Sequence, residues 1–88
     1  MMYYAYALWS ESQSKTYVGH TSDLNQRLNE HIHGRSDATK YCKDWLLIYN
    51  ERFSTRSLAM RREKFLKTGR SREILKKYLE KNFSGAVA

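Results

Sequence analysis

The run from Tyr3 to Trp9 constrains the fold of this chain more than any other segment. Every residue in it is aromatic or apolar, so neither face of the run, once extended, suits contact with water. A strand with two apolar faces lies inside a sheet and is covered on both sides. We therefore predict a central strand that ends near Trp9.

Length and cysteine content limit the kind of protein this can be. A chain of 88 residues favours one domain with one small core. Cys42 is the only cysteine, which excludes an intramolecular disulfide and a multi-cysteine zinc site and favours a reducing compartment. The N-terminus lacks a basic region, and Ser10 and Glu11 end its apolar run too early for a signal peptide or a membrane span. We expect a soluble cytoplasmic protein.

A second strand and a helix are predicted next. Residues 16–18 are β-branched or aromatic and follow a short polar stretch, which indicates a hairpin partner strand ending at Gly19. Ser22 is a favourable N-cap, Asp23 suits the first helical turn, and Gly34 suits the left-handed position after the last turn. Together these signals predict a helix between Ser22 and Gly34.

Side chains four residues apart define two rows on this helix. Leu24, Leu28 and Ile32 form one row, which we expect to be buried. Arg27 and His31 form a second row beside it. Both of these functional side chains would therefore point into one cleft.

The second half of the chain predicts a third strand and another helix. Residues 35–44 are polar and are expected to form an exposed loop. The apolar run from Trp45 to Tyr49 predicts a strand that completes a small sheet. Ser54 or Thr55 would then begin a helix that runs to about Lys67.

The C-terminal end predicts one more helix. Gly69 would close the preceding helix, and Ser71 would cap a final helix that runs to about Lys81. Residues 83–88 are expected to form a frayed tail. Residues 1–82 would thus make a single domain with strand, strand, helix, strand, helix, helix in order.

Charge is distributed unevenly along the chain. Residues 1–51 hold five Lys or Arg and six Asp or Glu, whereas residues 52–81 hold eleven and three. A basic half of this kind is typical of a nucleic-acid binder, because cationic side chains neutralise phosphates and release counterions. The alternative is a well solvated helical surface. The presence of Glu63, a candidate metal ligand, on the same segment favours nucleic acid.

Five separated positions together resemble a known family. They lie in Tyr4-Ala5-Tyr6, in Tyr17-Val18-Gly19, in the frame RLNEH that carries Arg27 and His31, and in Ala59-Met60-Arg61-Arg62-Glu63. This pattern resembles the GIY-YIG endonuclease superfamily in its small standalone form, over roughly residues 3 to 80. The first motif has lost its glycine and isoleucine but keeps its tyrosine. The resemblance implies an α+β fold, with a three-stranded antiparallel sheet flanked by helices.

The resemblance also implies a role for each of the five residues. Tyr6 would orient or deprotonate the attacking water, and Tyr17 would hydrogen-bond the phosphate or the water. Arg27 would hold the scissile phosphate with its forked donors, and His31 would relay a proton or hydrogen-bond a tyrosine hydroxyl. Glu63 would be the only protein ligand to a divalent cation, Mg²⁺ or Mn²⁺.

Each of these residues also has an ordinary interpretation when it is considered alone. The tyrosines would be half-buried strand residues, and Arg27 and His31 would be solvated helix residues. Glu63 has Lys67 four residues on, a common surface ion pair. We favour the functional interpretation because all five positions agree in type, order and spacing.

Other polar residues near the motifs stay outside the predicted site. The histidines His20, His31 and His33 do not have the spacing of a standard zinc site. Lys15 and Lys40 lie near the motifs, where they could contact DNA phosphates, but solvated lysines are common and we leave both outside the site. Larger family members carry a downstream asparagine, but Asn82 has no motif around it that would support a match.

The leading hypothesis is a metal-dependent DNA endonuclease with little sequence preference, acting in repair or recombination on damaged, branched or single-stranded DNA. RNA is a second substrate class. The chain has no room for a separate targeting domain, so a partner protein would supply targeting. One alternative is a non-catalytic nucleic-acid-binding module that keeps the fold and the basic surface. Another is a structural protein that binds a protein partner through aromatic residues, with weak salt dependence.

Overall fold

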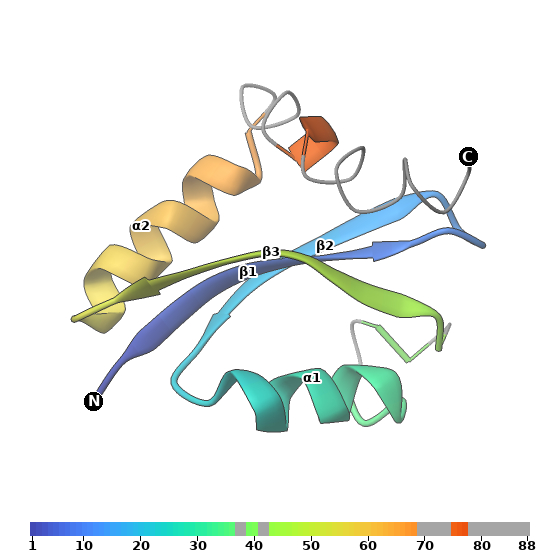
Figure 1. The fold of residues 1–88 in the computed structure, drawn as a ribbon, viewed down its shortest axis with the longest axis horizontal. Coiled ribbons are helices and arrows are strands. Elements are labelled where there is room, and N and C mark those ends of the chain that lie inside the picture. Colours follow the sequence, from blue (N-terminus) through green and yellow to red (C-terminus); the bar gives the residue numbers. More distant parts are fainter. Residues whose placement is uncertain (37–38, 41–42, 69–74, 78–88) are drawn as a thin grey trace.

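A three-stranded antiparallel sheet forms the centre of the molecule. The computed structural model describes residues 1–36, 39–40, 43–68 and 75–77 (Figure 1). The elements are, in chain order, β1 (Tyr3–Ser10), β2 (Lys15–Thr21), α1 (Leu24–Ile32), β3 (Trp45–Phe53) and α2 (Arg56–Leu66). The strands lie in the order β2-β1-β3, and β1 is antiparallel to both neighbours. The predicted α+β fold with a central first strand is confirmed.

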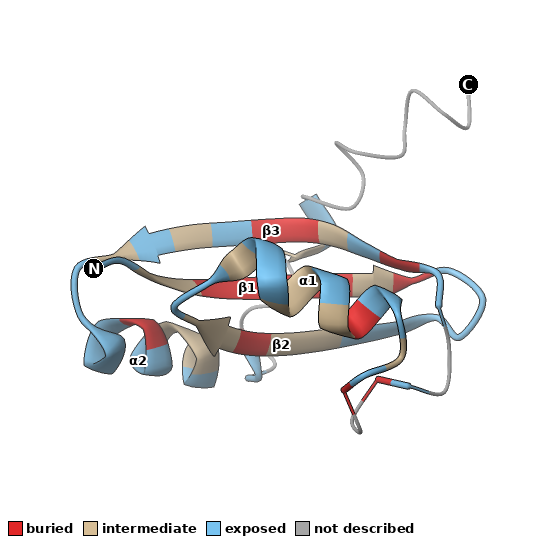
Figure 2. Cartoon of the chain, turned by 90° about the horizontal axis from the view of Figure 1, so that it is seen from below, coloured by how far each residue is buried: buried red, intermediate tan, exposed pale blue. Residues whose placement is uncertain are grey.

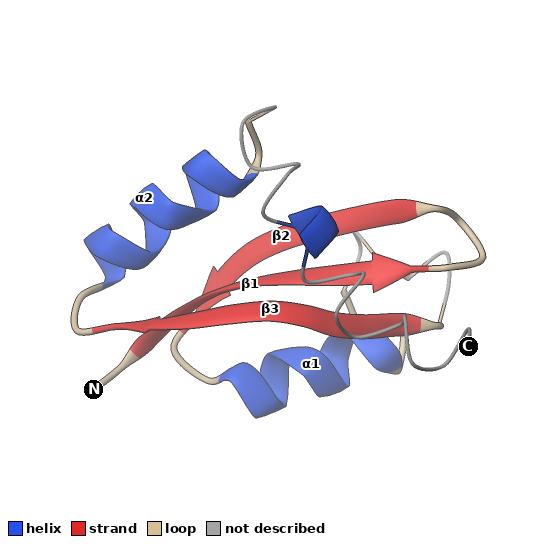
Figure 3. Ribbon diagram, turned by 45° about the horizontal axis from the view of Figure 1, so that its top comes forward, coloured by secondary structure: helices blue, strands red, loops and turns tan. Residues whose placement is uncertain are grey.

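The two helices cover opposite faces of the sheet, as Figures 1 and 3 show. Side chains of β1 alternate between these faces. Tyr6 and Leu8 belong to the core on the α1 side, whereas Ala5 and Ala7 belong to the core on the α2 side. Four consecutive residues of the middle strand, Ala5 to Leu8, are therefore buried, and Figure 2 shows this stretch of β1 in red. This is the double coverage that the apolar run predicts.

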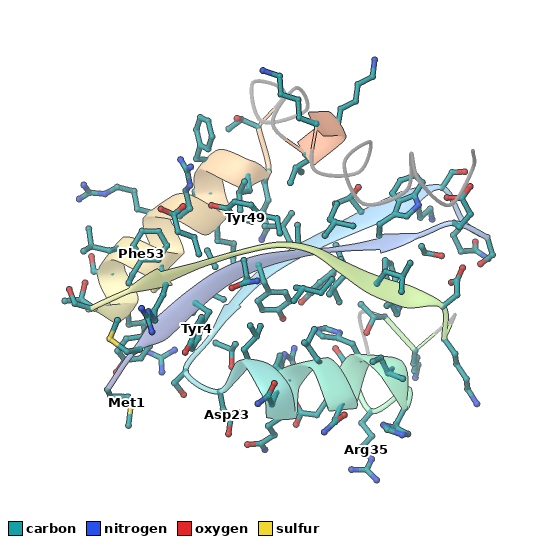
Figure 4. The ribbon with its side chains drawn as sticks, in the orientation of Figure 1. Met1, Tyr4, Asp23, Arg35, Tyr49 and Phe53 are labelled. Carbon is teal, nitrogen blue, oxygen red and sulfur yellow. The ribbon has the colours of Figure 1, made fainter. Side chains whose placement is uncertain are left out.

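Strand β3 is longer than its apolar core and contains a bulge. Its pairing with β1 shifts between Ala7 and Leu8, because Ala7 faces Tyr49 and Leu8 faces Leu47. Ile48 is the extra residue, so Ile48 and Tyr49 both enter the α2-side core. Figure 4 shows Tyr49 on that side of the sheet.

The predicted end of β3 at Tyr49 is wrong by four residues. Pairing continues through a polar segment, because Tyr4 at the start of β1 faces Arg52, and Tyr3 faces Phe53. Exposed polar side chains do not interrupt a strand whose backbone has a partner, and among the described strands β3 lies at an edge of the sheet. The strand therefore ends opposite Tyr3, where β1 begins.

The prediction that Gly19 ends β2 is also wrong. The strand continues to Thr21, and Gly19 pairs with Tyr6 in the middle of the ladder. The following helix is capped by Asp23 and not by Ser22: Asp23 Oδ1 accepts from the backbone N–H of Gln26 at 3.1 Å. The longer strand displaces the helix start by one residue.

The interior face of α1 differs from the expected leucine and isoleucine row. Leu24 and Leu28 pack against the α1-side core, but Ile32 is 41% exposed. His31 is the buried residue of this helix instead. Gly34 has φ +71°, which confirms the predicted left-handed position after the helix. In the last turn of α1, the buried face of the helix therefore contains His31 in place of Ile32.

Helix α2 agrees closely with its sequence signals. Thr55 is the N-cap, with its side chain accepting from the backbone N–H of Leu58, and Lys67 is the C-cap. Of the predicted final helix only residues 75–77 are described, and these are helical. Gly69, Ser71, Lys81 and the tail at 83–88 lie outside the described residues. In the described part of the chain, no helix is long and apolar enough to cross a membrane.

Candidate active site

The pairing of β1 with β2 brings the two motif tyrosines to one face. Tyr6 lies opposite Gly19, and Leu8 lies opposite Tyr17, so these side chains point toward α1. The centroids of the two tyrosine rings are 6.4 Å apart. A Cβ on Gly19 would lie 2.8 Å from Tyr6 Oη, so the absence of a side chain there makes room for the phenol. This is the structural reason for a glycine in the second motif.

A chain of buried hydrogen bonds connects Tyr6 to the loop after α1. Tyr6 Oη lies 2.8 Å from His31 Nε2, and His31 Nδ1 lies 2.7 Å from Thr39 Oγ1. The side chain of Trp45 donates through Nε1 to the Thr39 carbonyl at 3.0 Å. Tyr6, His31 and Thr39 are all fully buried. Both nitrogens of His31 are thus engaged, which fixes the orientation of the ring.

Burial keeps both members of the tyrosine and histidine pair neutral. Burial, and to a smaller extent the nearby Arg27 charge, lowers the pKa of His31 to about 4. Burial also raises the pKa of Tyr6 to about 12, against the opposing effect of Arg27. At neutral pH, Tyr6 is therefore a phenol and His31 an uncharged imidazole.

Arg27 and Tyr17 form the more exposed half of this cluster. The Tyr17 ring lies 4.8 Å from the His31 ring, centroid to centroid. Arg27 Nη1 donates to Glu30 Oε1 at 3.0 Å. The pKa of Arg27 lies above its ordinary value, first because of Glu30 and then because of the phenol groups of Tyr6 and Tyr17, which the guanidinium faces. An anion near Arg27 would therefore meet Tyr17, with the buried Tyr6 hydroxyl behind it.

Glu63 reaches the site from the other face of the sheet. It belongs to α2, and its Oε1 lies 2.8 Å from His20 Nδ1 while its Oε2 accepts from Lys67 Nζ at 3.1 Å. Partial burial raises the pKa of Glu63, but His20 and Lys67 outweigh that effect, and the pKa lies below its ordinary value. The carboxylate is ionised at neutral pH.

A surface cavity of about 750 Å³ lies beside Glu63, and Tyr17 is the member of the tyrosine cluster that borders it. Tyr17, Glu63 and Lys67 are among the residues that line it. Tyr6, Tyr17, Arg27 and His31 thus lie together where α1 packs on the sheet, whereas Glu63 lies on α2 and contacts His20 of strand β2. Its negative charge still contributes to raising the pKa of Tyr6.

Two residues of this arrangement were missed by the sequence analysis. Thr39 lies in the polar loop before β3, where no pattern marks a buried partner for His31. His20 was considered only as a zinc ligand. The period of two along β2 places His20 on the α2 face together with Val18, and this alternation was the available signal.

Comparison with known proteins agrees with this fold. Residues 2–82 match the family model described as the GIY-YIG catalytic domain. This chain belongs to the GIY-YIG family. The domain is a nuclease-type fold, and it implies a nucleic-acid substrate in general.

Small single-domain relatives resemble this GIY-YIG domain. It is 35% identical over 75 residues to the UPF0213 protein SH2523 of Staphylococcus haemolyticus, which covers 84% of this chain and 90% of the relative. The solution NMR structure of the UPF0213 protein BH0048 from Bacillus halodurans superimposes with a TM-score of 0.54 at 28% identity, over 88% of this chain and 84% of the other.

GIY-YIG nucleases generally use a divalent metal, and the residues around Glu63 are compatible with one. The carboxylate is ionised, partly exposed and at the rim of a cavity. Across the described residues, no group of three or more His, Cys, Asp or Glu side chains surrounds a common point, so the three histidines build no zinc cluster there. A cation held by one or two protein groups, with water and phosphate oxygens as further ligands, suits Mg²⁺ or Mn²⁺.

Proposed function

We propose that this GIY-YIG domain is a divalent-metal-dependent DNA endonuclease with little sequence preference. The proposal rests on the arrangement of one cationic and one anionic side chain around the two motif tyrosines. Arg27 faces the phenol groups of Tyr6 and Tyr17, while the ionised Glu63 borders the same cavity as Tyr17. A cation site and a guanidinium on either side of a tyrosine suit a phosphodiester, whose negative charge increases in the transition state.

The substrate would be held by the partly exposed residues. Arg27 would exchange its ion pair with Glu30 for the scissile phosphate, to which its fork can donate two hydrogen bonds. Tyr17 would donate to the phosphate or to the attacking water. A cation bound at Glu63 would polarise the phosphate and assist water activation and leaving-group departure.

Tyr6 and His31 would act from beneath this surface. A phenol with a pKa of about 12 costs about 7 kcal/mol to ionise at pH 7, so Tyr6 is a poor base in the geometry described. We propose an orienting role, in which the hydrogen bond with His31 fixes the Tyr6 hydroxyl toward Arg27 and Tyr17. Thr39 would hold His31 in the matching orientation.

DNA contact outside the site would come from basic side chains. Arg56, Arg61 and Lys64 are exposed on α2, the helix that carries Glu63. Phosphate contacts of this kind carry no base information, which agrees with low sequence specificity and with a partner protein for targeting. Damaged, branched or single-stranded DNA, in repair or recombination, is the proposed substrate, with RNA as a second class.

Cleavage assays test this proposal. Supercoiled, single-stranded and branched DNA would be incubated with Mg²⁺ or Mn²⁺ and the parent protein, Glu63→Ala, Arg27→Ala or Tyr6→Phe. We expect metal-dependent cutting that each change reduces by at least about 100-fold. Glu51→Ala and Tyr4→Phe are the matched controls, since Glu51 pairs with Arg62 at the β3 edge and Tyr4 precedes the site on β1. Both controls should cut like the parent.

One observation favours the binding-module alternative. Glu63 already has two cationic or potentially cationic partners, His20 and Lys67, and this ion-pair network needs no metal. A binding module predicts no cutting on any substrate and tight, salt-sensitive DNA binding in metal-free buffer. It also predicts that Glu63→Ala leaves that affinity unchanged or raises it, because a negative charge is removed from a basic surface. This result would reject the endonuclease proposal.

A further inference from the structure

We propose that His20 is a second protein ligand to the cation at Glu63, so that the site binds Co²⁺ and Mn²⁺ more tightly than Mg²⁺. The inference rests on the proposed function for the existence of a cation site, and it adds a nitrogen ligand to that site. The inference rests on the contact between His20 Nδ1 and Glu63 Oε1, which are 2.8 Å apart, and Glu63 also lines the cavity.

The spacing of these two atoms is already close to that of neighbouring metal ligands. Bonds of about 2.1 Å to an octahedral cation place adjacent ligand atoms roughly 3 Å apart. The observed 2.8 Å needs an increase of only a few tenths of an ångström. The ring would bind through the Nδ1 lone pair, with its hydrogen on Nε2.

Lys67 restricts how the carboxylate can bind. Its Nζ donates to Glu63 Oε2 at 3.1 Å, on the oxygen that His20 does not contact. Oε1 is therefore the oxygen that faces both His20 and an incoming cation. Binding through Oε1 alone, with Oε2 held by Lys67, lets His20 and Glu63 occupy adjacent positions without moving the lysine.

His20 is anchored better than a surface histidine. It lies within β2, opposite the fully buried Ala5, and its side chain is 23% exposed. The other two histidines make different hydrogen bonds. His31 is hydrogen-bonded to Tyr6 and Thr39, and His33 Nδ1 is hydrogen-bonded to the carbonyl of Asn29. His20 is thus the histidine whose ring nitrogen meets a carboxylate. The preceding residue on the strand is Gly19, which lies opposite Tyr6.

Donor chemistry gives the expected metal preference. Carboxylate and water ligands suit Mg²⁺, whereas imidazole nitrogen favours later divalent metals, whose affinity rises from Mn²⁺ to Co²⁺. A site built from Glu63 alone would discriminate weakly among these ions. A site that includes His20 would favour Co²⁺ most, then Mn²⁺, then Mg²⁺.

Calorimetry with the full chain, without DNA, tests the proposal. Mg²⁺, Mn²⁺ and Co²⁺ would be titrated separately into the parent, His20→Asn, Glu63→Gln and the control His33→Asn. His20→Asn can still hydrogen-bond Glu63 but lacks the ring nitrogen. We expect it to weaken Co²⁺ binding by at least about tenfold and Mg²⁺ binding by less than about twofold. Glu63→Gln should weaken binding of all three ions, and His33→Asn of none.

A direct observation of the ring completes the experiment. Substoichiometric Co²⁺ should broaden the ring signals of His20 in NMR spectra before those of His31 and His33. Unchanged Co²⁺ affinity in His20→Asn, with affinity lost in Glu63→Gln, would overturn the role of His20 and leave the cation site standing. Unchanged affinity in both variants would remove the cation site as well. Co²⁺ binding that depends on His20, without DNA cutting, would support this inference while rejecting the nuclease.

Discussion

At the residue scale, a glycine is needed at position 19 because of a side chain on the neighbouring strand β1, and not because of the backbone conformation at Gly19. An added Cβ would lie 2.8 Å from Tyr6 Oη and 3.0 Å from Tyr6 Cζ. Because Tyr6 is fully buried and hydrogen-bonded to His31, its ring has little room to move away. We expect Gly19→Ala to lower the free energy of unfolding by about 1–3 kcal/mol, as overpacking does.

A double-mutant cycle checks this cause. Urea unfolding would be measured for Gly19→Ala, Tyr6→Phe and the double variant. Removing the Tyr6 hydroxyl relieves the shorter of the two contacts, so Gly19→Ala should cost less in the Tyr6→Phe background. Equal costs in both backgrounds would show that the phenol hydroxyl is not what excludes a side chain at position 19.

At the scale of elements, Thr39 connects helix α1 to strand β3. Its hydroxyl meets His31 at the end of α1, and its carbonyl accepts from Trp45 at the start of β3. Thr39→Val keeps the shape but leaves His31 Nδ1 without a buried partner, which should cost about 1–3 kcal/mol of unfolding free energy. Thr39→Ser should recover most of that loss. Thermal unfolding of the two variants measures the difference, and a Thr39→Val variant that is as stable as the parent would show that the hydroxyl contributes nothing.

Sequence patterns predicted elements best where their cause is local. Helix α2 could be placed closely because Thr55 caps it through a bond three residues away. The predicted end of β2 was wrong because a glycine often ends a strand. Here a glycine is needed at position 19 because the Tyr6 phenol on the neighbouring strand leaves no room for a side chain. The end of β3 was wrong for a similar reason, since Arg52 and Phe53 are extended by pairing with β1 and not by their own apolar pattern.

At the scale of the whole molecule, burial of His31 makes stability depend on pH. The ordinary pKa of 6.5 falls to about 4 in the folded protein, so between these values the unfolded chain binds a proton that the folded chain does not. The free energy of unfolding should therefore decrease as pH falls from 6.5 to 4, by on the order of 3 kcal/mol from this residue. Denaturant unfolding across this range measures the slope. His31→Gln should flatten it, and the exposed-site control His33→Gln should not.

The site as a whole was only partly predictable. Residue types and spacing indicated Tyr6, Tyr17, Arg27, His31 and Glu63, and the first four lie together where α1 packs on the sheet. Their surroundings depend on long-range packing. No local pattern shows that His31 is fully buried against Thr39, or that Glu63 belongs to a helix on the opposite face of the sheet.

The topology of the sheet implies an order in which this site assembles. Tyr6, Gly19 and Tyr17 belong to a hairpin between neighbouring segments, whose short loop closes at little entropic cost. Glu63 reaches its place only after β3 has paired with the edge of β1 that lies opposite β2, and after α2 has packed on the sheet. Contacts between distant segments form slowly. During synthesis, Tyr6, Tyr17, Arg27 and His31 would thus leave the ribosome before Glu63 does. The nascent chain would therefore contain the groups that face the phosphate before it contains the carboxylate that binds the metal.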